Sequence, residues 1–124
     1  MRDCWNTDIV AELAPTDGDA VLYKTRYSGF YDTELDRLLR AAGIQQLIVV
    51  GATTSVCVDS TVRDAMFRDY HCLVVADATA EPIAADAARS NHEASLLTLE
   101  LLFGAVAEST DLIAGLQAAA AVPS

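Results

Sequence analysis

The chain has 124 residues, of which 52% are hydrophobic, so it is long and apolar enough to fold around one core and is not intrinsically disordered. Its formal net charge of −10 excludes nucleic acid and anionic membrane surfaces as partners, because both require a basic face. The three cysteines show no paired spacing, and we expect neither a signal peptide nor a spanning segment. These features predict a reduced, cytoplasmic protein.

The first part of the chain predicts one strand and one helix. Residues 20–24 form a short apolar run, which predicts a strand that ends on Lys24, and an aromatic loop follows at residues 26–31. Thr33 is predicted to open a helix in a capping box, because leucines follow it at helical spacing. Gly43 is predicted to end that helix, since glycine readily adopts the left-handed conformation found there.

The middle of the chain alternates between strands and helices. Residues 46–50 form a continuous apolar run that predicts a strand covered on both faces. A helix is predicted directly after Cys57, with an apolar stripe formed by Val58, Val62, Ala65 and Met66. A third strand is predicted at residues 72–76. From residue 81 the pattern is helical again, and Ser90 and Glu93 form a predicted capping box. Residues 94–103 are apolar on nearly every side, which predicts either deep burial or an oligomer interface.

The last part predicts a short strand at residues 105–107 and a final helix from about Asp111. Strands that alternate with helices are typical of β-α-β crossovers, so we predict an α/β fold with a mainly parallel sheet and helices on both faces. No repeat or linker divides the chain, and residues 1–124 are therefore predicted to form a single domain.

Three residues with reactive or charged side chains fall at the predicted carboxyl edge of the sheet, where ligands of such folds bind. Lys24 ends the first predicted strand, Cys57 follows the second, and Asp77 ends the third. A cysteine at a helix start, beside an ammonium group, is typical of a nucleophile for covalent acyl transfer. The turn before the helix would supply N–H groups for an oxyanion. Asp77 is expected to cap a turn rather than to react.

Five other polar or sulfur-containing residues are expected to have ordinary roles. Cys72 lies inside a predicted strand and is expected in the core, whereas Cys4 is expected to be exposed. His71 is expected at a strand edge and His92 on a helix surface or interface. Asp59 lies about 200° around the helix from Cys57, so it is a poor general base for that thiol.

The aromatic loop after Lys24 is a candidate wall of the substrate pocket. Arg26, Tyr27, Phe30 and Tyr31 are the candidate substrate-binding residues in it. The alternative is an aromatic patch that only packs against the protein, and the sequence leaves both interpretations open.

The sequence resembles the isochorismatase-like cysteine hydrolases, which have a Rossmann-like fold. The resemblance lies in the runs KTRYSGF at 24–30, TELD at 33–36, GATTSVCV at 51–58, TVRDA at 61–65 and DA at 77–78. Within that family, the run RYSGFY at 26–31 is similar to the branch of ureidoacrylate and N-carbamoyl amidohydrolases.

The resemblance implies a three-layer α/β/α fold, assembly into dimers or tetramers, no cofactor and no metal site. It implies hydrolysis of a small amide or ureido compound through a covalent acyl-enzyme. Cys57 matches the family's nucleophile and Lys24 its lysine. Thr53, Thr54 and Cys57 match the oxyanion turn, with N–H groups from Thr54 and Cys57 and a cis peptide bond between Thr53 and Thr54.

The sequence departs from the family in one respect. The family's catalytic aspartate ends a first strand, and nothing in residues 1–23 matches that pattern. We therefore expect an N-terminally incomplete domain that lacks this strand. The base would be missing from a shortened chain or supplied by a partner or a swapped segment. Alternatively, the protein would be a catalytically impaired binding or assembly subunit or, on weaker grounds, a thiol redox sensor.

Overall fold

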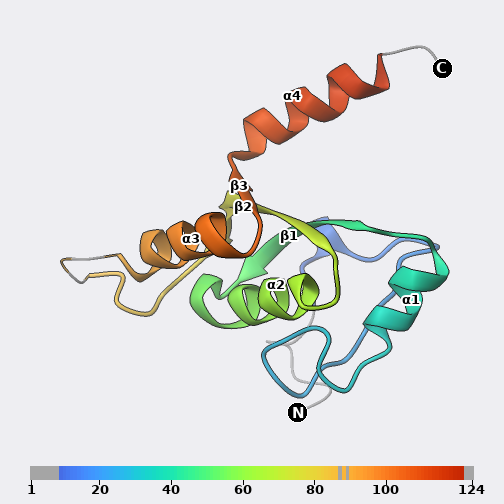
Figure 1. The fold of residues 1–124 in the computed structure, drawn as a ribbon, viewed down its shortest axis with the longest axis horizontal. Helices are drawn as coiled ribbons and strands as arrows, with labels where there is room; N and C mark the ends of the chain where they lie inside the picture. Colours follow the sequence, from blue (N-terminus) through green and yellow to red (C-terminus); the bar gives the residue numbers. More distant parts are fainter. Residues whose placement is uncertain (1–8, 87, 89, 122–124) are drawn as a thin grey trace.

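A computed structural model describes residues 9–86, 88 and 90–121 (Figure 1). The described part contains a short 3₁₀ turn (Ala11–Leu13), one π-helical turn, four helices and three strands. In chain order, the elements after the 3₁₀ turn are α1 (Leu35–Ala41), β1 (Gln46–Ala52), the π-helical turn (Thr54–Val58), α2 (Asp59–Met66), β2 (His71–Ala80), α3 (Asn91–Leu102), β3 (Ala105–Ala107) and α4 (Ser109–Ala120).

The three strands form one parallel sheet in the order β1–β2–β3. Gln46 pairs with His71 at the start of β1, and Leu73 pairs with Ala105 at the start of β3. The parallel sheet with helical crossovers confirms the predicted α/β class. The predicted strands at 46–50, 72–76 and 105–107 are also confirmed, although β2 continues four residues further, to Ala80.

The core lies between this sheet and the pair of helices α2 and α3, which Figure 1 shows beside each other against the strands. Val62 of α2, Val74 of β2 and Leu99 of α3 are fully buried at its centre. Burial of one such side chain contributes about 1.5–3 kcal/mol. The predicted apolar stripe of α2 is confirmed, because Val58 and Ala65 are buried as well.

The opposite face of β1 is open among the described residues. Leu47 and Val49 pack on the core, whereas Ile48 and Val50 are 52% and 56% exposed. The prediction that this strand is covered on both faces is therefore wrong for the described part. The reason is that α2 and α3 lie together on one side, while α4 extends away from the body (Figure 1).

Helix α3 is also less buried than its composition predicted. Leu99 is its one buried residue, and Leu97, Leu101 and Leu102 are more than half exposed. Deep burial of this helix is therefore wrong for the described chain, and an oligomer interface stays a prediction.

The predicted strand at residues 20–24 is wrong. This segment is irregular, and β1 is an edge of the described sheet, so the run pairs with none of the three strands. A run of apolar residues becomes a strand only when a neighbour completes its backbone hydrogen bonds. The run is also not a core segment, because Val21 and Tyr23 are 49% and 73% exposed.

Helix α1 begins at Leu35, two residues after the predicted start. Thr33 lies outside the helix, where its hydroxyl donates to the Gly29 carbonyl (2.6 Å) and accepts from the Leu35 N–H (3.3 Å). The hydroxyl therefore links the loop to the helix start without forming the predicted capping box. Gly43 follows the helix with φ of +68°, as predicted for a left-handed C-terminal residue.

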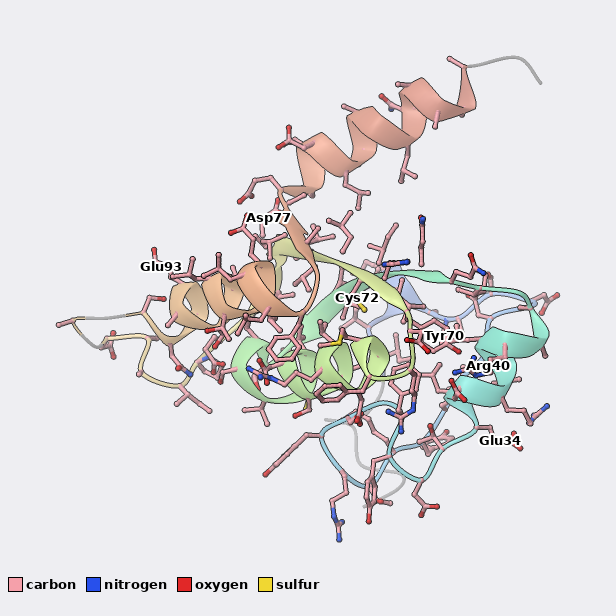
Figure 2. All side chains as sticks on the ribbon, in the orientation of Figure 1. Glu34, Arg40, Tyr70, Cys72, Asp77 and Glu93 are labelled. Carbon is pink, nitrogen blue, oxygen red and sulfur yellow. The ribbon has the colours of Figure 1, made fainter. Side chains whose placement is uncertain are left out.

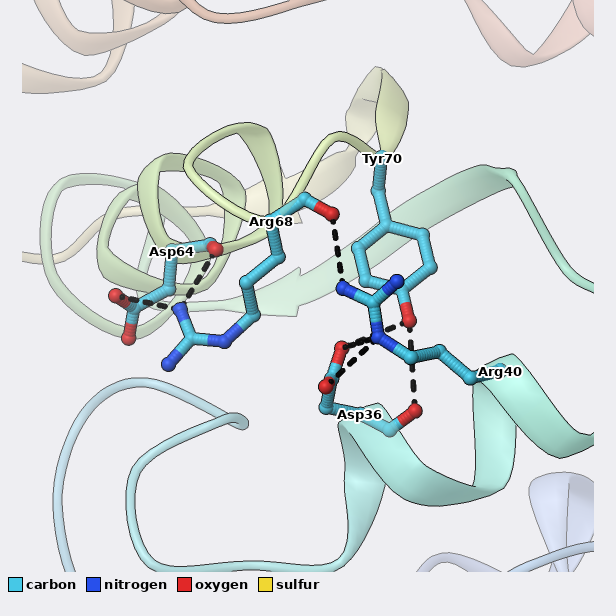
Figure 3. A network of polar contacts seen from close by, with 5 residues as sticks. All are labelled: Asp36, Arg40, Asp64, Arg68 and Tyr70. Carbon is cyan, nitrogen blue, oxygen red and sulfur yellow. Dashed lines mark hydrogen bonds and ion pairs between the residues drawn. The ribbon is translucent and has the colours of Figure 1, made fainter.

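A polar network attaches α1 to the end of α2 (Figure 3). The Tyr70 hydroxyl donates to Asp36 (2.9 Å), and Arg40 binds both Asp36 and the Arg68 carbonyl. Arg68 in turn pairs with Asp64 (3.1 Å). The hydrogen bond from Arg40, followed by that from Tyr70, lowers the pKa of the Asp36 carboxyl. These contacts hold α1 beside the start of β2.

The segment after β2 is a turn rather than the predicted helix from residue 81. Pro82 has no N–H for a helical ladder, and the Ile83 N–H is taken by the Glu81 carboxylate (2.9 Å). Ala84 has a positive φ of +58°, which ends any right-handed helix there. The predicted cap at Ser90 is confirmed, because its hydroxyl accepts from the Glu93 N–H (3.2 Å).

Candidate active site

Cys57 lies where the sequence placed it, between a parallel strand and a helix. It belongs to the π-helical turn Thr54–Val58, which we call the Cys57 turn, between the end of β1 and the start of α2. The Val58 N–H reaches back five residues to the Thr53 carbonyl (3.1 Å), which closes the wide turn. The thiol is half-buried and makes no disulfide.

Lys24 meets Cys57 although no strand carries it. Its Nζ lies 3.6 Å from the Cys57 Sγ and donates to the Arg26 carbonyl at 3.0 Å. The second bond holds the ammonium in place beside the sulfur. A cation at this distance stabilises negative charge on the sulfur, which is the form that attacks carbonyl carbon. The predicted pair is thus brought together by a loop that folds back on itself.

The cis peptide bond is one residue earlier than expected. It joins Ala52 to Thr53, not Thr53 to Thr54. The expected position was carried over from the family motif, and the backbone places the bond at the last residue of β1.

Thr61 connects the Cys57 turn to the aromatic loop. Its hydroxyl donates to the Cys57 carbonyl (2.6 Å) and accepts from the Gly29 N–H (2.9 Å). Thr61 lies four positions after Cys57, one helical turn further on, and this spacing alone would have predicted that its side chain lies beside Cys57.

The four candidate substrate-binding residues take different positions. Tyr27 and Tyr31 are 62% and 54% exposed, and the Arg26 guanidinium lies 6.0 Å from the Tyr31 ring centre. Phe30 is buried in the core and stacks on Tyr70 with ring centres 5.7 Å apart. Arg26, Tyr27 and Tyr31 therefore remain available to a ligand, while Phe30 anchors the loop.

Two residues at the Cys57 turn were missed. His92, expected on a helix surface or interface, is half-buried, and its Nδ1 shares a hydrogen bond with the Thr54 hydroxyl (2.9 Å). Glu81 accepts the Ser55 N–H at 2.8 Å. That hydrogen bond holds the pKa of the Glu81 carboxyl below its usual range. No local sequence signal identifies such contacts, because they join residues 26 to 38 positions apart.

The other polar and sulfur-containing residues have structural roles. Cys72 is buried in the core, as predicted, and burial raises the pKa of its thiol. Asp77 accepts hydrogen bonds from the N–H and hydroxyl of Ser109 (2.8 and 2.5 Å), so it caps the start of α4 (Figure 2). Asp59 is paired with Arg63 at 2.7 Å. His71 is exposed at the start of β2, as predicted, and Cys4 lies outside the described residues.

No carboxylate of the described residues hydrogen-bonds to Lys24 or Cys57. No group of three or more His, Cys, Asp or Glu that could hold a metal ion is present in the described part of the chain. The described site therefore consists of a thiol, an ammonium group and a turn, and no carboxylate of the described residues is hydrogen-bonded to the thiol or to the ammonium group. None of the described helices is long and apolar enough to cross a bilayer.

A thiol beside an ammonium group, at the carboxyl end of a parallel strand, places the chain in the class of α/β proteins whose site is suited to nucleophilic acyl transfer. The family model for the isochorismatase domain matches residues 2–111, so the chain belongs to the isochorismatase family. This confirms the resemblance read from the motifs.

The curated relatives include ureidoacrylate amidohydrolases. The chain is 45% identical over 107 residues to RutB of Serratia proteamaculans, covering 86% of this chain and 42% of the relative. It is 42% identical over 123 residues to RutB of Methylobacterium radiotolerans, covering 99% of this chain and 45% of the relative. The chain thus spans a little under half the length of these relatives.

Solved structures show the same fold. A cysteine hydrolase from Pseudomonas syringae pv. phaseolicola superposes with a TM-score of 0.85 at 33% identity, covering 95% of this chain and 58% of that one. N-carbamoylsarcosine amidase from Thermoplasma acidophilum gives 0.76 at 34% identity, covering 88% and 59%.

Proposed function

We propose that this chain carries the nucleophilic half of a cysteine amidohydrolase acting on a small amide or ureido compound. The observation that carries the proposal is the 3.6 Å contact between Lys24 Nζ and Cys57 Sγ at the carboxyl end of β1. The family membership and the similarity to ureidoacrylate amidohydrolases and N-carbamoylsarcosine amidase support the substrate class.

In the proposed reaction, the Cys57 thiolate attacks the carbonyl carbon and forms a tetrahedral oxyanion, which N–H groups of Thr54 and Cys57 would hold. The C–N bond breaks, the nitrogen leaves as the protonated amine, and the acyl or carbamoyl group stays on sulfur. Water then cleaves the thioester, which releases the acid and restores the thiol. Lys24 stabilises the thiolate at the start and the end.

The reaction also needs a proton acceptor. A general base must take the thiol proton and activate the water. No carboxylate of the described residues hydrogen-bonds to Cys57, and Glu81 and Asp59 are bound to other groups, so the proposal assigns this role to a carboxylate outside the described residues.

Arg26, Tyr27 and Tyr31 are the proposed contacts for the substrate. They stand exposed on the loop that also positions Lys24. Arg26 would bind a carboxylate of the substrate, because its planar guanidinium makes paired hydrogen bonds to such groups. Phe30 would act indirectly, by holding the loop in place.

Assembly into a homo-oligomer and a cytoplasmic location complete the proposal. The exposed Leu97 and Leu101 of α3 and the exposed Ile113 and Leu116 of α4 support an interface between chains. The free thiol of Cys57 is consistent with a reducing compartment.

The test is turnover of ureidoacrylate and N-carbamoylsarcosine by the 124-residue chain, followed through the released amine, with Cys57→Ala as the control. Turnover that the substitution abolishes supports the full proposal. A stoichiometric adduct on Cys57 without turnover supports the nucleophile and shows that the base is not engaged. Absence of both turnover and adduct would overturn the proposal.

A further inference from the structure

The start of the Cys57 turn is held by Glu81, which follows β2, and by two residues of the first turn of α3. Thr54 is fully buried, and its hydroxyl is bonded to His92 in the first turn of α3. The next residue, Ser55, is held twice: its N–H donates to Glu81 and its hydroxyl accepts from Asn91 (2.9 Å). Three side chains thus fix two consecutive residues.

The residues that make these contacts are themselves fixed. The second oxygen of Glu81 accepts the Ile83 N–H, so the carboxylate is bound on both sides. His92 lies two residues after Ser90, which caps α3 through the Glu93 N–H. The contacts therefore come from groups with little freedom to move.

The other end of the turn is held separately. Thr61 accepts nothing from the β2–α3 segment and binds the Cys57 carbonyl from within α2. The orientation of the N–H groups between Thr54 and Cys57 is consequently set by α2 at one end and by Glu81 and His92 at the other.

We propose that Glu81 and His92 are positioning residues, which orient the backbone of the Cys57 turn for oxyanion binding without touching the substrate. The inference rests on the proposed function for its catalytic meaning. It goes beyond that function because it assigns a role to residues that are 24 and 35 positions from the nucleophile in sequence.

Two reactions of the same thiol separate positioning from general stability. Acylation by p-nitrophenyl acetate passes through an oxyanion, whereas alkylation by iodoacetamide is a displacement that forms none. A displaced turn would slow the first reaction and leave the second nearly unchanged. A loosened or partly unfolded protein would change both.

We expect Glu81→Ala and His92→Leu to slow acylation of Cys57 by about tenfold, less than the loss on deleting an oxyanion donor outright. Alkylation should stay within about twofold, because no oxyanion forms in it. Glu81→Gln and His92→Asn keep an acceptor near the same position and should restore a large part of the acylation rate.

The matched controls are Glu93→Gln and His71→Gln. Glu93 is exposed on the same helix start (Figure 2), and His71 is exposed at the start of β2, so neither should change either rate. Equal losses in acylation and alkylation, or no loss in either, would overturn the inference. Should Glu81→Ala fail to fold, the comparison of His92→Leu with His71→Gln applies in its place.

Failure of the proposed function is distinguishable from failure of this inference. If Cys57 of the unaltered protein is not acylated, the proposed function fails. Amide hydrogen exchange at residues 54–58 then decides the positioning role. Faster exchange there in Glu81→Ala and His92→Leu than in Glu93→Gln and His71→Gln supports the role, and equal exchange overturns it.

Discussion

Gly104 allows α3 to end directly against β2, and a single added methyl group tests this packing. The Gly104 N–H donates to the Leu99 carbonyl (2.9 Å) at the end of α3. A Cβ built on Gly104 would lie 2.6 Å from the Cys72 carbonyl oxygen and 3.3 Å from the Cys72 carbonyl carbon. The obstacle is therefore backbone of a central strand, which cannot rotate away like a side chain.

The cost follows from that geometry. The 2.6 Å contact is 0.4 Å inside the 3.0 Å limit that real Cβ contacts respect, so β2 or the chain at Gly104 must shift. The neighbouring pair Leu73 and Ala105 joins β2 to β3 and would be strained by the shift. Overpacking of this kind costs about 1–3 kcal/mol in the free energy of unfolding.

Urea unfolding followed by circular dichroism measures the loss in Gly104→Ala, with Gly115→Ala as the matched control. Gly115 lies within α4 and has nothing within 4 Å of a built Cβ, so alanine there should be neutral or stabilise by up to about 1 kcal/mol through helix propensity. Equal stabilities of the two variants would refute the packing described at Gly104.

Three further predictions follow from single contacts. Cys57 should react with iodoacetamide in the folded protein while Cys72 reacts only after unfolding, because Cys72 is buried and its thiol pKa is raised. Peptide mapping by mass spectrometry measures the labelling of each cysteine, and equal labelling in the folded protein would contradict this prediction. Thr61→Val should lower the free energy of unfolding in urea by about 1–3 kcal/mol, because the Cys57 carbonyl loses the hydroxyl that donates to it. Thr61→Ser keeps the hydroxyl and should retain most of the stability. Equal losses of stability in the two variants would contradict the role of the hydroxyl. The hydrogen bonds from Ser109 lower the pKa of Asp77 in the folded protein, so the cap on α4 is present above the ordinary carboxyl pKa of 3.8 and is lost as the pH falls through the lower folded value. Amide exchange in α4, relative to the intrinsic exchange rate at each pH, should accelerate as the cap is lost. A relative exchange rate that does not change with pH would contradict this prediction.

The sequence predicted most of the regular elements because their patterns are local. The apolar run of β1, the stripe of α2 and the cap at Ser90 each depend on neighbours within a few residues, and each is found in the structure. The strand expected at residues 20–24 and the helix expected from residue 81 failed for the opposite reason. A strand needs a partner, and the proline and carboxylate at residues 81–82 divert the backbone from a helix.

The candidate site shows the same division. Cys57 could be placed from the strand and helix on either side of it. Lys24 was expected at the site as the end of a strand that does not form, and it still reaches Cys57 through a loop. The roles of Glu81 and His92 depend on the return of β2 and α3 to the Cys57 turn, which no local pattern encodes. The cis peptide bond lies between Ala52 and Thr53, one residue before the position that the family motif implied.

The most direct test of the account is the rate at which Cys57 forms an acyl adduct with p-nitrophenyl acetate, located by peptide mapping in the unaltered chain and in Lys24→Met. Arg37→Met, which removes an exposed cation of α1, serves as the control for charge. We predict an adduct on Cys57 that forms at least about tenfold more slowly in Lys24→Met, because the thiolate loses its neighbouring cation. An unaltered chain that forms no adduct on Cys57, or one whose rate is the same with and without Lys24, would contradict it.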